Sequence, residues 1–341
     1  MWRVKLLKRI ILTIAFFTLF VIAAFWLLSL RNIPAQGDIT YGVTFSKYRA
    51  DELHLDWKET YEAILTDLKV KHLRLIAHWD LVEPEHGTYN FSEIDYQMRR
   101  AEEEGATVIL AVGRRLPSWP ECHEPAWVGN DSLDKQKEYI LAYITEVVDR
   151  YKDSPSLTAW QVENEPFIIG FAKGHCGKLD ISFLKQEIAL VHKLDPKHPV
   201  LLTGSGELGF WANTWKLGDI FGTTLYRQVW NRDLNTFISY PTTPAFYRFQ
   251  RNVAELMTGE KKPAIIAELA AEPWLEGATA DAPLEEQLAH MNLDTLKQTV
   301  AFASKTSFGE QYFWGAEWWY YLKRVHGDST IWEWAKGYFD R

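Results

Sequence analysis

The sequence lacks several features that would assign it to other classes of protein. No run of basic residues occurs outside the N-terminus and the net charge is −8, so nucleic acid is not expected as a partner. We find no internal repeat, low-complexity segment or second domain. The first apolar run, residues 40–45, is not followed by a glycine-rich phosphate loop, which disfavours a doubly wound open sheet. The ten histidines include no His-x-His pair on that run, which disfavours a metal-dependent hydrolase.

A long uncharged run dominates the N-terminus. Residues 10–30 carry no charge, and at about 1.5 Å per residue such a helix spans the ~30 Å hydrocarbon core of a bilayer. The basic residues that precede it are Arg3, Lys5, Lys8 and Arg9. Because no clear cleavage site follows, an uncleaved signal-anchor is favoured over a peptide that is removed to release a secreted protein.

This N-terminus predicts where the protein lies and how it is divided. The basic flank is expected to stay in the cytoplasm, so the large domain of this single-pass cell-membrane protein would be extracytoplasmic. Residues 1–31 then form the cytoplasmic flank and transmembrane anchor, residues 32–38 a linker, and residues 39–341 one folded domain.

The only two cysteines, Cys122 and Cys176, each lie in a loop that follows a predicted strand. The two strands are neighbours and an extracytoplasmic domain permits oxidation, so a disulfide between these cysteines is favoured. Free thiols are one alternative, and a metal site that adds His123 and His175 is another. The order Cys-His and then His-Cys matches no strong ligand spacing, so no metal site is predicted.

Strand-like and helix-like segments alternate along residues 39–341. The predicted strands are residues 40–45, 73–77, 107–112, 157–162, 200–203, 220–225, 264–267 and 311–314. The predicted helices are residues 57–68, 92–104, 133–151, 181–194, 244–257, 284–304 and 330–338, with a doubtful one in residues 206–218. Eight such units predict an α/β fold, a (β/α)8 TIM barrel, with the open sheet as the alternative.

Two of these strands end in glutamates. The run at residues 157–162 is followed by Asn164 and Glu165, and Pro166 prevents its continuation. The run at residues 264–267 ends in Glu268. Barrel enzymes keep their chemistry at the carboxyl ends of the strands. Cleaving a glycosidic bond requires one carboxylic acid to protonate the leaving oxygen and one carboxylate to stabilise or trap the sugar. Glu165 is the candidate acid and Glu268 the candidate nucleophile.

These residues resemble a known family. Residues 160–166, Trp-Gln-Val-Glu-Asn-Glu-Pro, look like the Asn-Glu-Pro signature of the retaining glycoside hydrolases of clan A, which include (β/α)8 cellulases, β-mannanases, xylanases and β-galactosidases. The resemblance implies that Glu165 is the acid/base, that Asn164 holds the sugar 2-hydroxyl, and that Glu268 is the nucleophile.

Further segments are similar to the same clan. Residues 74–79, Arg-Leu-Ile-Ala-His-Trp, and the Glu-Pro…Gly-x-Tyr-x-Phe pattern in residues 83–91 match a clan segment whose arginine supports the nucleophile. The resemblance also implies a tyrosine in contact with the nucleophile and an aromatic floor for the sugar, which would be Tyr226 and Trp314. The predicted substrate-binding residues are Arg74, His78, Trp79, Asn164, Tyr226 and Trp314.

Several assignments keep an alternative. Glu272 or Glu317 could replace Glu268 as nucleophile. Arg114 and Arg115 either contact substrate or face solvent, and the aromatic run at residues 318–321 either lines a cleft or covers the barrel rim. Glu268 is followed by Leu269 where the clan often has an aromatic residue or a glycine, and the sixth strand lacks a His-x-Tyr. The exact family and the sugar therefore stay open.

The sequence thus predicts a glycosidase that cleaves a β-linked oligo- or polysaccharide with retention, through a glycosyl-enzyme intermediate. No metal or organic cofactor is expected, since two carboxylates suffice for this reaction. The alternative is a non-catalytic glycan-binding barrel at the cell surface, which would keep the aromatic residues but need neither glutamate.

Overall fold

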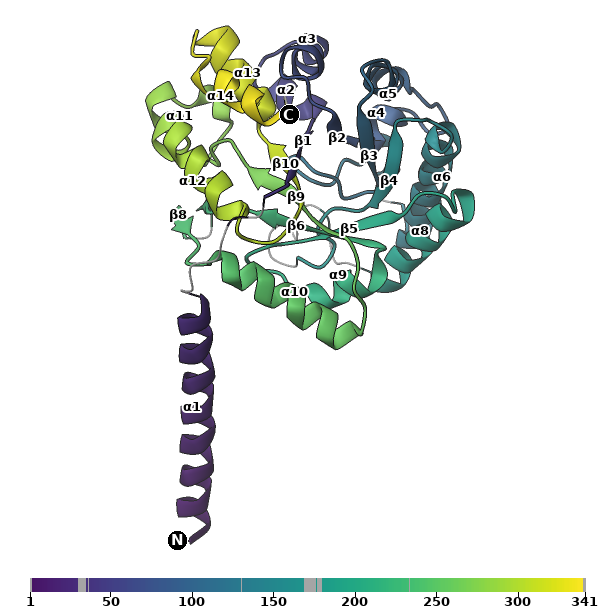
Figure 1. Cartoon of the computed structure of the whole chain (residues 1–341). Helices are drawn as coiled ribbons and strands as arrows, with labels where there is room; N and C mark the ends of the chain where they lie inside the picture. Colours follow the sequence, from purple (N-terminus) through teal and green to yellow (C-terminus); the bar gives the residue numbers. More distant parts are fainter. Residues whose placement is uncertain are drawn as a thin grey trace.

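Eight parallel strands close into a barrel in the computed structural model, which describes residues 2–29, 35, 37–129, 131–168, 176, 180–232 and 234–339 (Figure 1). The strands are β1 (Thr40–Thr44), β2 (His72–Ile76), β3 (Thr107–Val112), β4 (Leu157–Val162), β5 (Val200–Gly204), β6 (Ile220–Leu225), β9 (Ala264–Ala270) and β10 (Glu310–Trp314). They follow one another around the barrel in chain order, and β10 pairs with β1. The predicted (β/α)8 barrel is confirmed, and each predicted strand forms.

Side chains fill the barrel interior in layers. One buried cluster consists of Ile109, Ala159, Leu201, Ile265, Ala267 and Tyr312. A second cluster lies at the carboxyl ends of β2 and β3, where Ile76, Ala111 and Leu116 pack with Trp314. Gly42 leaves room for this filling, because a Cβ atom there would lie 2.6 Å from the ring of Tyr312. The barrel is therefore a packed core, and a site can form only above its upper layer.

Helices surround the barrel on the outside (Figure 1). They are α2 (Lys47–Glu52), α3 (Trp57–Glu62), α4 (Trp79–Val82), α5 (Ser92–Glu103), α6 (Leu133–Tyr151), α8 (Ile181–Leu194), α9 (Trp211–Leu217), α10 (Pro244–Thr258), α11 (Leu284–His290), α12 (Leu293–Ala303), α13 (Ala316–Val325) and α14 (Thr330–Phe339). A π-helical turn at Ala63–Asp67 continues α3, and short 3-10 turns form at Ala126–Val128 and Thr279–Asp281.

The helix α6 illustrates how the sequence sets these elements. The side chain of Ser132 caps its first turn by accepting a hydrogen bond from the N–H of Lys135 at 3.4 Å, and a cap of this kind contributes about 1 kcal/mol. One face of the helix then turns toward the barrel. The buried residues of that face are Ile140, Tyr143, Ile144, Val147, Val148 and Tyr151. Their helical spacing is what predicted the element.

The structure corrects several predicted elements. The aromatic run at residues 318–321 lies in α13 and is buried, and the indole N–H of Trp319 donates to the carbonyl of Ala271 at 2.7 Å. It is therefore core and does not line a cleft. The helix predicted at residues 284–304 is interrupted at Met291, and the doubtful helix after β5 is real but short, as α9. A hairpin formed by β7 (Gln228–Asn231) and β8 (Thr236–Ser239) was not predicted.

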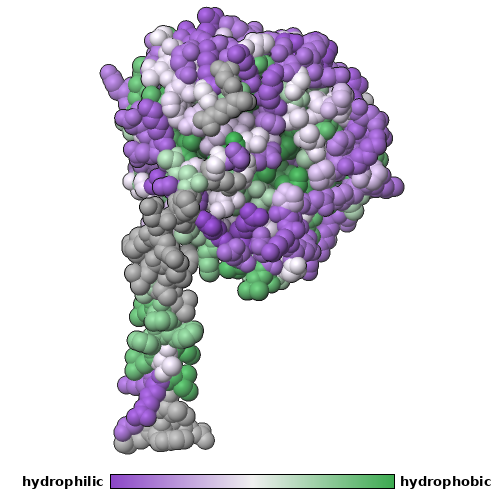
Figure 2. Space-filling model, viewed as in Figure 1, coloured by the Kyte–Doolittle hydropathy of each residue, from purple (hydrophilic) through white to green (hydrophobic). Residues whose placement is uncertain are grey.

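The N-terminal helix α1 (Trp2–Ser29) extends away from the barrel (Figure 1). Each of its described side chains is exposed, and hydrophobic colour marks much of its described surface in Figure 2. Within the described part of the chain, no helix is long and apolar enough to cross a membrane. The predicted transmembrane anchor, and with it the predicted membrane association, is therefore not supported. Most of the predicted linker, residues 32–34 and 36, lies outside the described residues.

The predicted disulfide is present. Cys122 follows β3 and Cys176 follows β4, and the bond joins the two loops with 5.4 Å between the Cα atoms. The bond consumes both thiols, which excludes the free-thiol alternative and the metal site built on these cysteines. His175, the other histidine of that alternative, lies outside the described residues.

Replacing both cysteines by serine is expected to lower the free energy of unfolding by about 2–4 kcal/mol, because the bond closes a loop with a sequence separation of 54 residues. Urea unfolding of the wild type and of the Cys122→Ser/Cys176→Ser variant measures the difference. A reductant should shift the wild type toward the variant and leave the variant unchanged. Equal stability of oxidised wild type and variant would contradict the structure.

Candidate active site

The two strand-end glutamates lie at the carboxyl end of the barrel. Glu268 is part of β9, and Glu165 lies three residues beyond the end of β4. After β4 the backbone takes left-handed conformations at Glu163 (φ 57°) and Glu165 (φ 42°), which non-glycine residues seldom adopt. Both Glu165 and Glu268 are largely buried, with exposed fractions of 8% and 6%. The backbone of this turn is therefore strained, and the strained conformation places the side chain of Glu165 at the mouth of the barrel.

Arg74 links the two strand ends. This residue of β2 is fully buried, and its guanidinium donates to Glu268 Oε1 at 2.8 Å and to Asn164 Oδ1 at 3.0 Å. Its Nε donates to Gln161 Oε1 at 2.7 Å. A buried guanidinium needs a carboxylate and further acceptors to offset the loss of water, and it has them here. The predicted contact between Arg74 and Glu268 is therefore present.

Asn164 has a fixed amide orientation. Its Oδ1 accepts hydrogen bonds from Arg74, from Thr203 Oγ1 at 3.1 Å and from Gln161 Nε2 at 3.3 Å. With the oxygen engaged by three donors, the amide nitrogen is the end that can donate to a ligand. Among the described residues, none accepts a hydrogen bond from this nitrogen. This is the orientation that binding a sugar hydroxyl requires.

Tyr226 holds the second oxygen of Glu268. The phenol O–H, just beyond β6, donates to Glu268 Oε2 at 2.8 Å, and the ring packs edge-on against Trp274 with 5.0 Å between centroids. Together, Arg74 and Tyr226 occupy one oxygen each of Glu268 and prevent the carboxylate from rotating. The predicted contact between Tyr226 and Glu268 is also present.

Glu165 has a different environment. Its backbone N–H donates to Thr203 Oγ1 at 2.8 Å, and its Oε1 accepts from Thr224 Oγ1 at 3.0 Å. Burial raises its pKa to about 8, with further contributions from the charges of Glu268 and Glu121. Glu165 is therefore mostly protonated at pH 7, which is the state that a proton donor needs.

The two alternative nucleophiles are less suited to that role. Glu272 accepts from Arg49 Nε at 2.8 Å and from Trp314 Nε1 at 2.7 Å, and burial raises its pKa. Glu317 accepts from the backbone N–H of Ser46 at 2.7 Å, and burial raises its pKa to about 8. Glu317 is therefore largely protonated at neutral pH and is a poor nucleophile, and burial shifts the pKa of Glu272 in the same direction.

The remaining predicted binding residues separate into two groups. Trp314 is partly exposed and packs on the upper core layer, which is where an aromatic floor would lie. Trp79 is fully buried, and its indole donates to Glu83 at 2.9 Å, so its ring cannot stack on a sugar. His78 is also buried, and its Nε2 faces the carbonyl of Pro117 at 3.4 Å. The structure therefore gives Trp79 and His78 packing positions rather than binding positions.

Sequence reasoning missed several residues of this site. Thr203 lies near the end of β5 and Thr224 near the end of β6. Both contact Glu165. Their positions at strand ends were the available signal. The loop after β3 brings Glu121 close enough for its charge to act on Glu165. Arg232, next to the unpredicted hairpin, lies 4.8 Å from the ring centre of Trp119 in the same loop.

Thermal stability is expected to fall as the pH rises from 7 to 8.5. The pKa values of Glu165 and Glu317 are raised to about 8, whereas an unfolded glutamate titrates near 4.5. The folded protein therefore holds protons that the unfolded chain has lost, and this stabilisation disappears as the pH passes the folded pKa values. The pKa values of His78 and His123 are lowered, but in this window they are neutral in both states. Calorimetry of the wild type and of Glu317→Gln checks this: the variant should show a shallower decline, and stability that rises with pH would contradict it.

The comparisons with known proteins agree with this geometry. Residues 49–175 match glycosyl hydrolase family 10. A probable mannan endo-1,4-beta-mannosidase C from Aspergillus terreus is 30% identical in an alignment of 168 residues that covers 44% of this chain and 39% of that protein. The beta-galactosidase Bga of Halorubrum lacusprofundi is 23% identical in an alignment of 128 residues that covers 32% of this chain and 18% of the relative. The chain thus spans less than half the length of these relatives.

Solved structures share the fold. A GH5_18 protein from Streptomyces cattleya, in complex with GlcNAc, aligns with a TM-score of 0.58 over 82% of this chain and 71% of its own, at 13% identity. At this identity the likeness concerns the fold alone. Barrel, family match and relatives together support a (β/α)8 glycoside hydrolase of clan A, which confirms the resemblance seen in the sequence. More particularly, mannan endo-1,4-beta-mannosidases recur among the relatives.

Proposed function

We propose that this protein is a retaining β-glycosidase with Glu165 as acid/base and Glu268 as nucleophile. The observation that carries the proposal is the contrast between two neighbouring carboxyl groups. Glu268 is bound by the guanidinium of Arg74 and the phenol of Tyr226, while the carboxyl group of Glu165 is buried, has no ion pair among the described residues and has a raised pKa. Two carboxyl groups in such unlike environments can divide the roles of acid and nucleophile.

The reaction then runs in two steps. In the first, Glu165 gives its proton to the glycosidic oxygen while a carboxylate oxygen of Glu268 bonds to the anomeric carbon, and the leaving sugar departs. The nucleophile has lost its charge in the resulting ester, so the pKa of Glu165 falls and this residue becomes a base. In the second step Glu165 takes a proton from water, the water oxygen bonds to the anomeric carbon, and Glu268 is released. The two inversions give net retention.

Binding groups around this pair suit a sugar. The amide nitrogen of Asn164 is left as a donor, and we assign it to the sugar 2-hydroxyl as the resemblance implies; the partly exposed ring of Trp314 offers a face for the pyranose. The relatives suggest the substrate class, since mannan endo-1,4-beta-mannosidases recur among them and one relative is a beta-galactosidase. We therefore propose a β-mannoside as the first substrate to test and a β-galactoside as the second.

The disulfide bears on location. A bond between Cys122 and Cys176 forms and persists in oxidising compartments, so we infer that the barrel works outside the cytoplasm. Alkylating the natively expressed protein before reduction tests the inference. Unreactive cysteines would support it, and two labelled thiols would refute it.

The function is tested by incubating the full-length chain with 4-nitrophenyl β-mannoside, β-galactoside and β-glucoside and with β-mannan oligosaccharides. Proton NMR of the anomeric signals during early turnover shows which anomer of the released sugar forms first. We expect turnover with the β-anomer of the released sugar appearing first. An α-anomer appearing first would refute retention. Calorimetric binding of the same oligosaccharides without any turnover would favour the non-catalytic glycan-binding barrel.

A further inference from the structure

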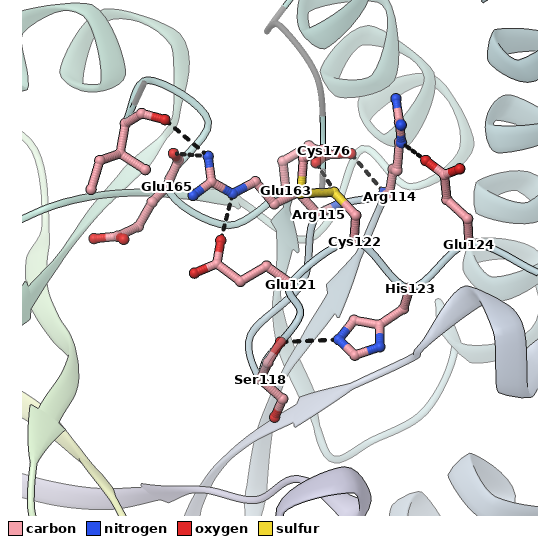
Figure 3. The surroundings of a disulfide bond; sticks show 11 residues. Arg114, Arg115, Ser118, Glu121, Cys122, His123, Glu124, Glu163, Glu165 and Cys176 are labelled. Carbon is pink, nitrogen blue, oxygen red and sulfur yellow. Dashed lines mark hydrogen bonds and ion pairs between the residues drawn. A yellow bond between two sulfur atoms is a disulfide. The ribbon is translucent and has the colours of Figure 1, made fainter. Parts of the chain in front are cut away.

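A third carboxylate, Glu121, reaches the mouth of the barrel from the loop after β3. Figure 3 shows its carboxylate beside the guanidinium of Arg115, which also donates to the backbone carbonyl of Glu165. Glu121 is 7% exposed, so a small part of it faces the outside. It also interacts with both proposed catalytic residues: the charge of Glu268 contributes to raising the pKa of Glu121, and the charge of Glu121 contributes to raising that of Glu165. Glu121 therefore lies near the point of cleavage.

Arg115 fixes one side of Glu121. Its Nε donates to Glu121 Oε2 at 2.6 Å, and its Nη1 donates to the carbonyl oxygens of Glu165 at 3.0 Å and Ile168 at 3.2 Å. One guanidinium thus ties the carboxylate of Glu121 to the backbone of the acid/base. Its Nη2 is enclosed and has no partner among the described residues, so Arg115 itself does not face a ligand. The other oxygen of Glu121, Oε1, receives no hydrogen bond from any described residue.

The loop holds Glu121 in a strained backbone conformation. Glu121 has φ 71° and Ser118 has φ 89°, which non-glycine residues adopt only at an energetic cost. The strain is maintained by hydrogen bonds of the Leu116 N–H to the carbonyl of Glu121 at 2.8 Å and of the Glu121 N–H to the carbonyl of Ser118 at 2.7 Å. The disulfide at Cys122 fixes the next residue. Strain that is over-determined in this way, beside reacting groups, points to a role for the side chain it places.

The base of the loop is fixed as well. Glu163 accepts hydrogen bonds from the backbone N–H groups of Arg114 at 2.7 Å and Arg115 at 2.8 Å. Gly113 makes this possible, because a Cβ atom there would lie 2.5 Å from Glu163 Oε1. Its φ of 126° would also strain any other residue. The loop after β3 is thus pinned at its start, at its turn and at the disulfide, and the position of Glu121 is determined before substrate arrives.

The chemistry of the pair limits what it can bind. The charge of Glu121 is balanced by Arg115, so the pair attracts neither an anion nor a cation strongly. What it offers is one carboxylate oxygen that accepts a hydrogen bond. A sugar hydroxyl is a neutral donor, and hydrogen bonds to a charged acceptor are stronger than those to a neutral one. Burial raises the pKa of Glu121 to about 7, so this charged acceptor prevails above that pH.

We propose that Glu121 is a specificity-determining residue, whose Oε1 accepts a hydrogen bond from one hydroxyl of the sugar ring held between Glu165 and Glu268. Arg115 acts as a positioning residue for it. This inference rests on the proposed glycosidase function. Because the 2-hydroxyl is assigned to Asn164 in the proposed function, the hydroxyl bound by Glu121 is expected to be another one, at position 3, 4 or 6 of the ring.

The test combines variants with substrate analogues. The kcat/KM of the wild type, Glu121→Ala and Glu121→Gln is measured on 4-nitrophenyl β-mannoside and on its 3-, 4- and 6-deoxy analogues, or on the matching galactosides if those are the substrates. We expect the wild type to lose about 10- to 100-fold on one analogue, because a hydrogen bond to a charged group is removed. Glu121→Ala should lose a similar factor on the intact substrate and lose nothing further on that same analogue. Glu121→Gln, which keeps an oxygen acceptor, should lie in between.

Controls separate this effect from loop damage and from failure of the proposed function. Glu124→Gln changes another carboxylate of the same loop, which is paired with Arg114. This variant should lose the same factor in kcat/KM as the wild type on each deoxy analogue. A structural role for Glu121 would lower kcat/KM equally on all substrates, and that result would overturn the inference while the glycosidase stands. If the wild type hydrolyses none of the substrates, the proposed function fails. In that case the Kd of the wild type and of Glu121→Ala is measured by calorimetry for the mannoside and its deoxy analogues. If removing the hydroxyl weakens binding by the same factor in both proteins for every analogue, the inference is overturned there too.

Discussion

If Glu268 is the nucleophile, as proposed, replacing it by alanine is expected to lower kcat by at least about 10⁴-fold, because the glycosyl-enzyme can no longer form. Arg74 and Tyr226 hold both oxygens of Glu268 in place. Kinetics on an aryl β-glycoside with a good leaving group measure the loss. Circular dichroism is needed beside it, because Arg74 is left in the interior without its carboxylate and the variant is expected to be less stable by about 3–5 kcal/mol.

Azide distinguishes a lost nucleophile from a damaged fold. In Glu268→Ala the small anion can enter the space left by the carboxylate and attack from the same face, giving an α-glycosyl azide. The matched variant is Glu272→Ala, in which a neighbouring buried carboxylate bound by Arg49 is removed. Rescue confined to Glu268→Ala identifies the nucleophile. An α-azide formed by Glu272→Ala would move that role to Glu272.

Replacing Glu165 by alanine should have the second largest effect, about 10²- to 10⁴-fold on natural oligosaccharides, where the departing alkoxide needs a proton. On a dinitrophenyl glycoside the first step needs little acid and should be spared, so the glycosyl-enzyme accumulates. Azide should then attack that intermediate and give a β-glycosyl azide, the opposite anomer to the Glu268→Ala product. A uniform loss on both kinds of substrate would argue against Glu165 as the acid.

The pH profile gives an independent test of Glu165. Its pKa is raised to about 8 by burial and by the charges of Glu268 and Glu121, and the first step uses the protonated form. The activity of the wild type on oligosaccharides should therefore decline as the pH rises past about 8. In Glu165→Gln the residual activity should lose this alkaline limb. An unchanged alkaline limb in the variant would assign it to another group.

Local sequence patterns were sufficient to predict the barrel, because each of its strands and helices is short and has its own recognisable pattern. Apolar runs of five to seven residues are bounded by turns, and capped helices lie between them. The errors occurred where tertiary packing decides. The run at residues 318–321 contains four aromatic residues, which suits a cleft as well as a core, and only its position in α13 against β10 buries it. The hairpin after β6 is short and mostly half-buried, so it has little hydrophobic pattern to detect.

For the site, the order of the predicted strands was enough to find the site residues that lie on or just after strands. It was not enough to find those that lie in the longer loops. Glu165, Glu268, Arg74 and Tyr226 follow from their places on β9 and β2 or just beyond β4 and β6, because the parallel strands of the barrel bring these positions together. Glu121 could not be found in this way, since it reaches the mouth through a turn whose shape depends on left-handed residues and a disulfide. Trp79 and His78 stood at a strand end too, but the chain turns into α4 there and buries them.

The reach of Arg74 from β2 to both β4 and β9 has a consequence for how the chain folds as it is synthesised. Residues up to β4 supply Arg74, Gln161 and Asn164, but Glu268 emerges only with β9. An uncompensated guanidinium in a dry interior costs several kcal/mol, so a nascent half-barrel must keep water around Arg74. That water can leave only when β9 docks and its carboxylate arrives. Expulsion of water from the barrel and completion of the charge pair are thus one event.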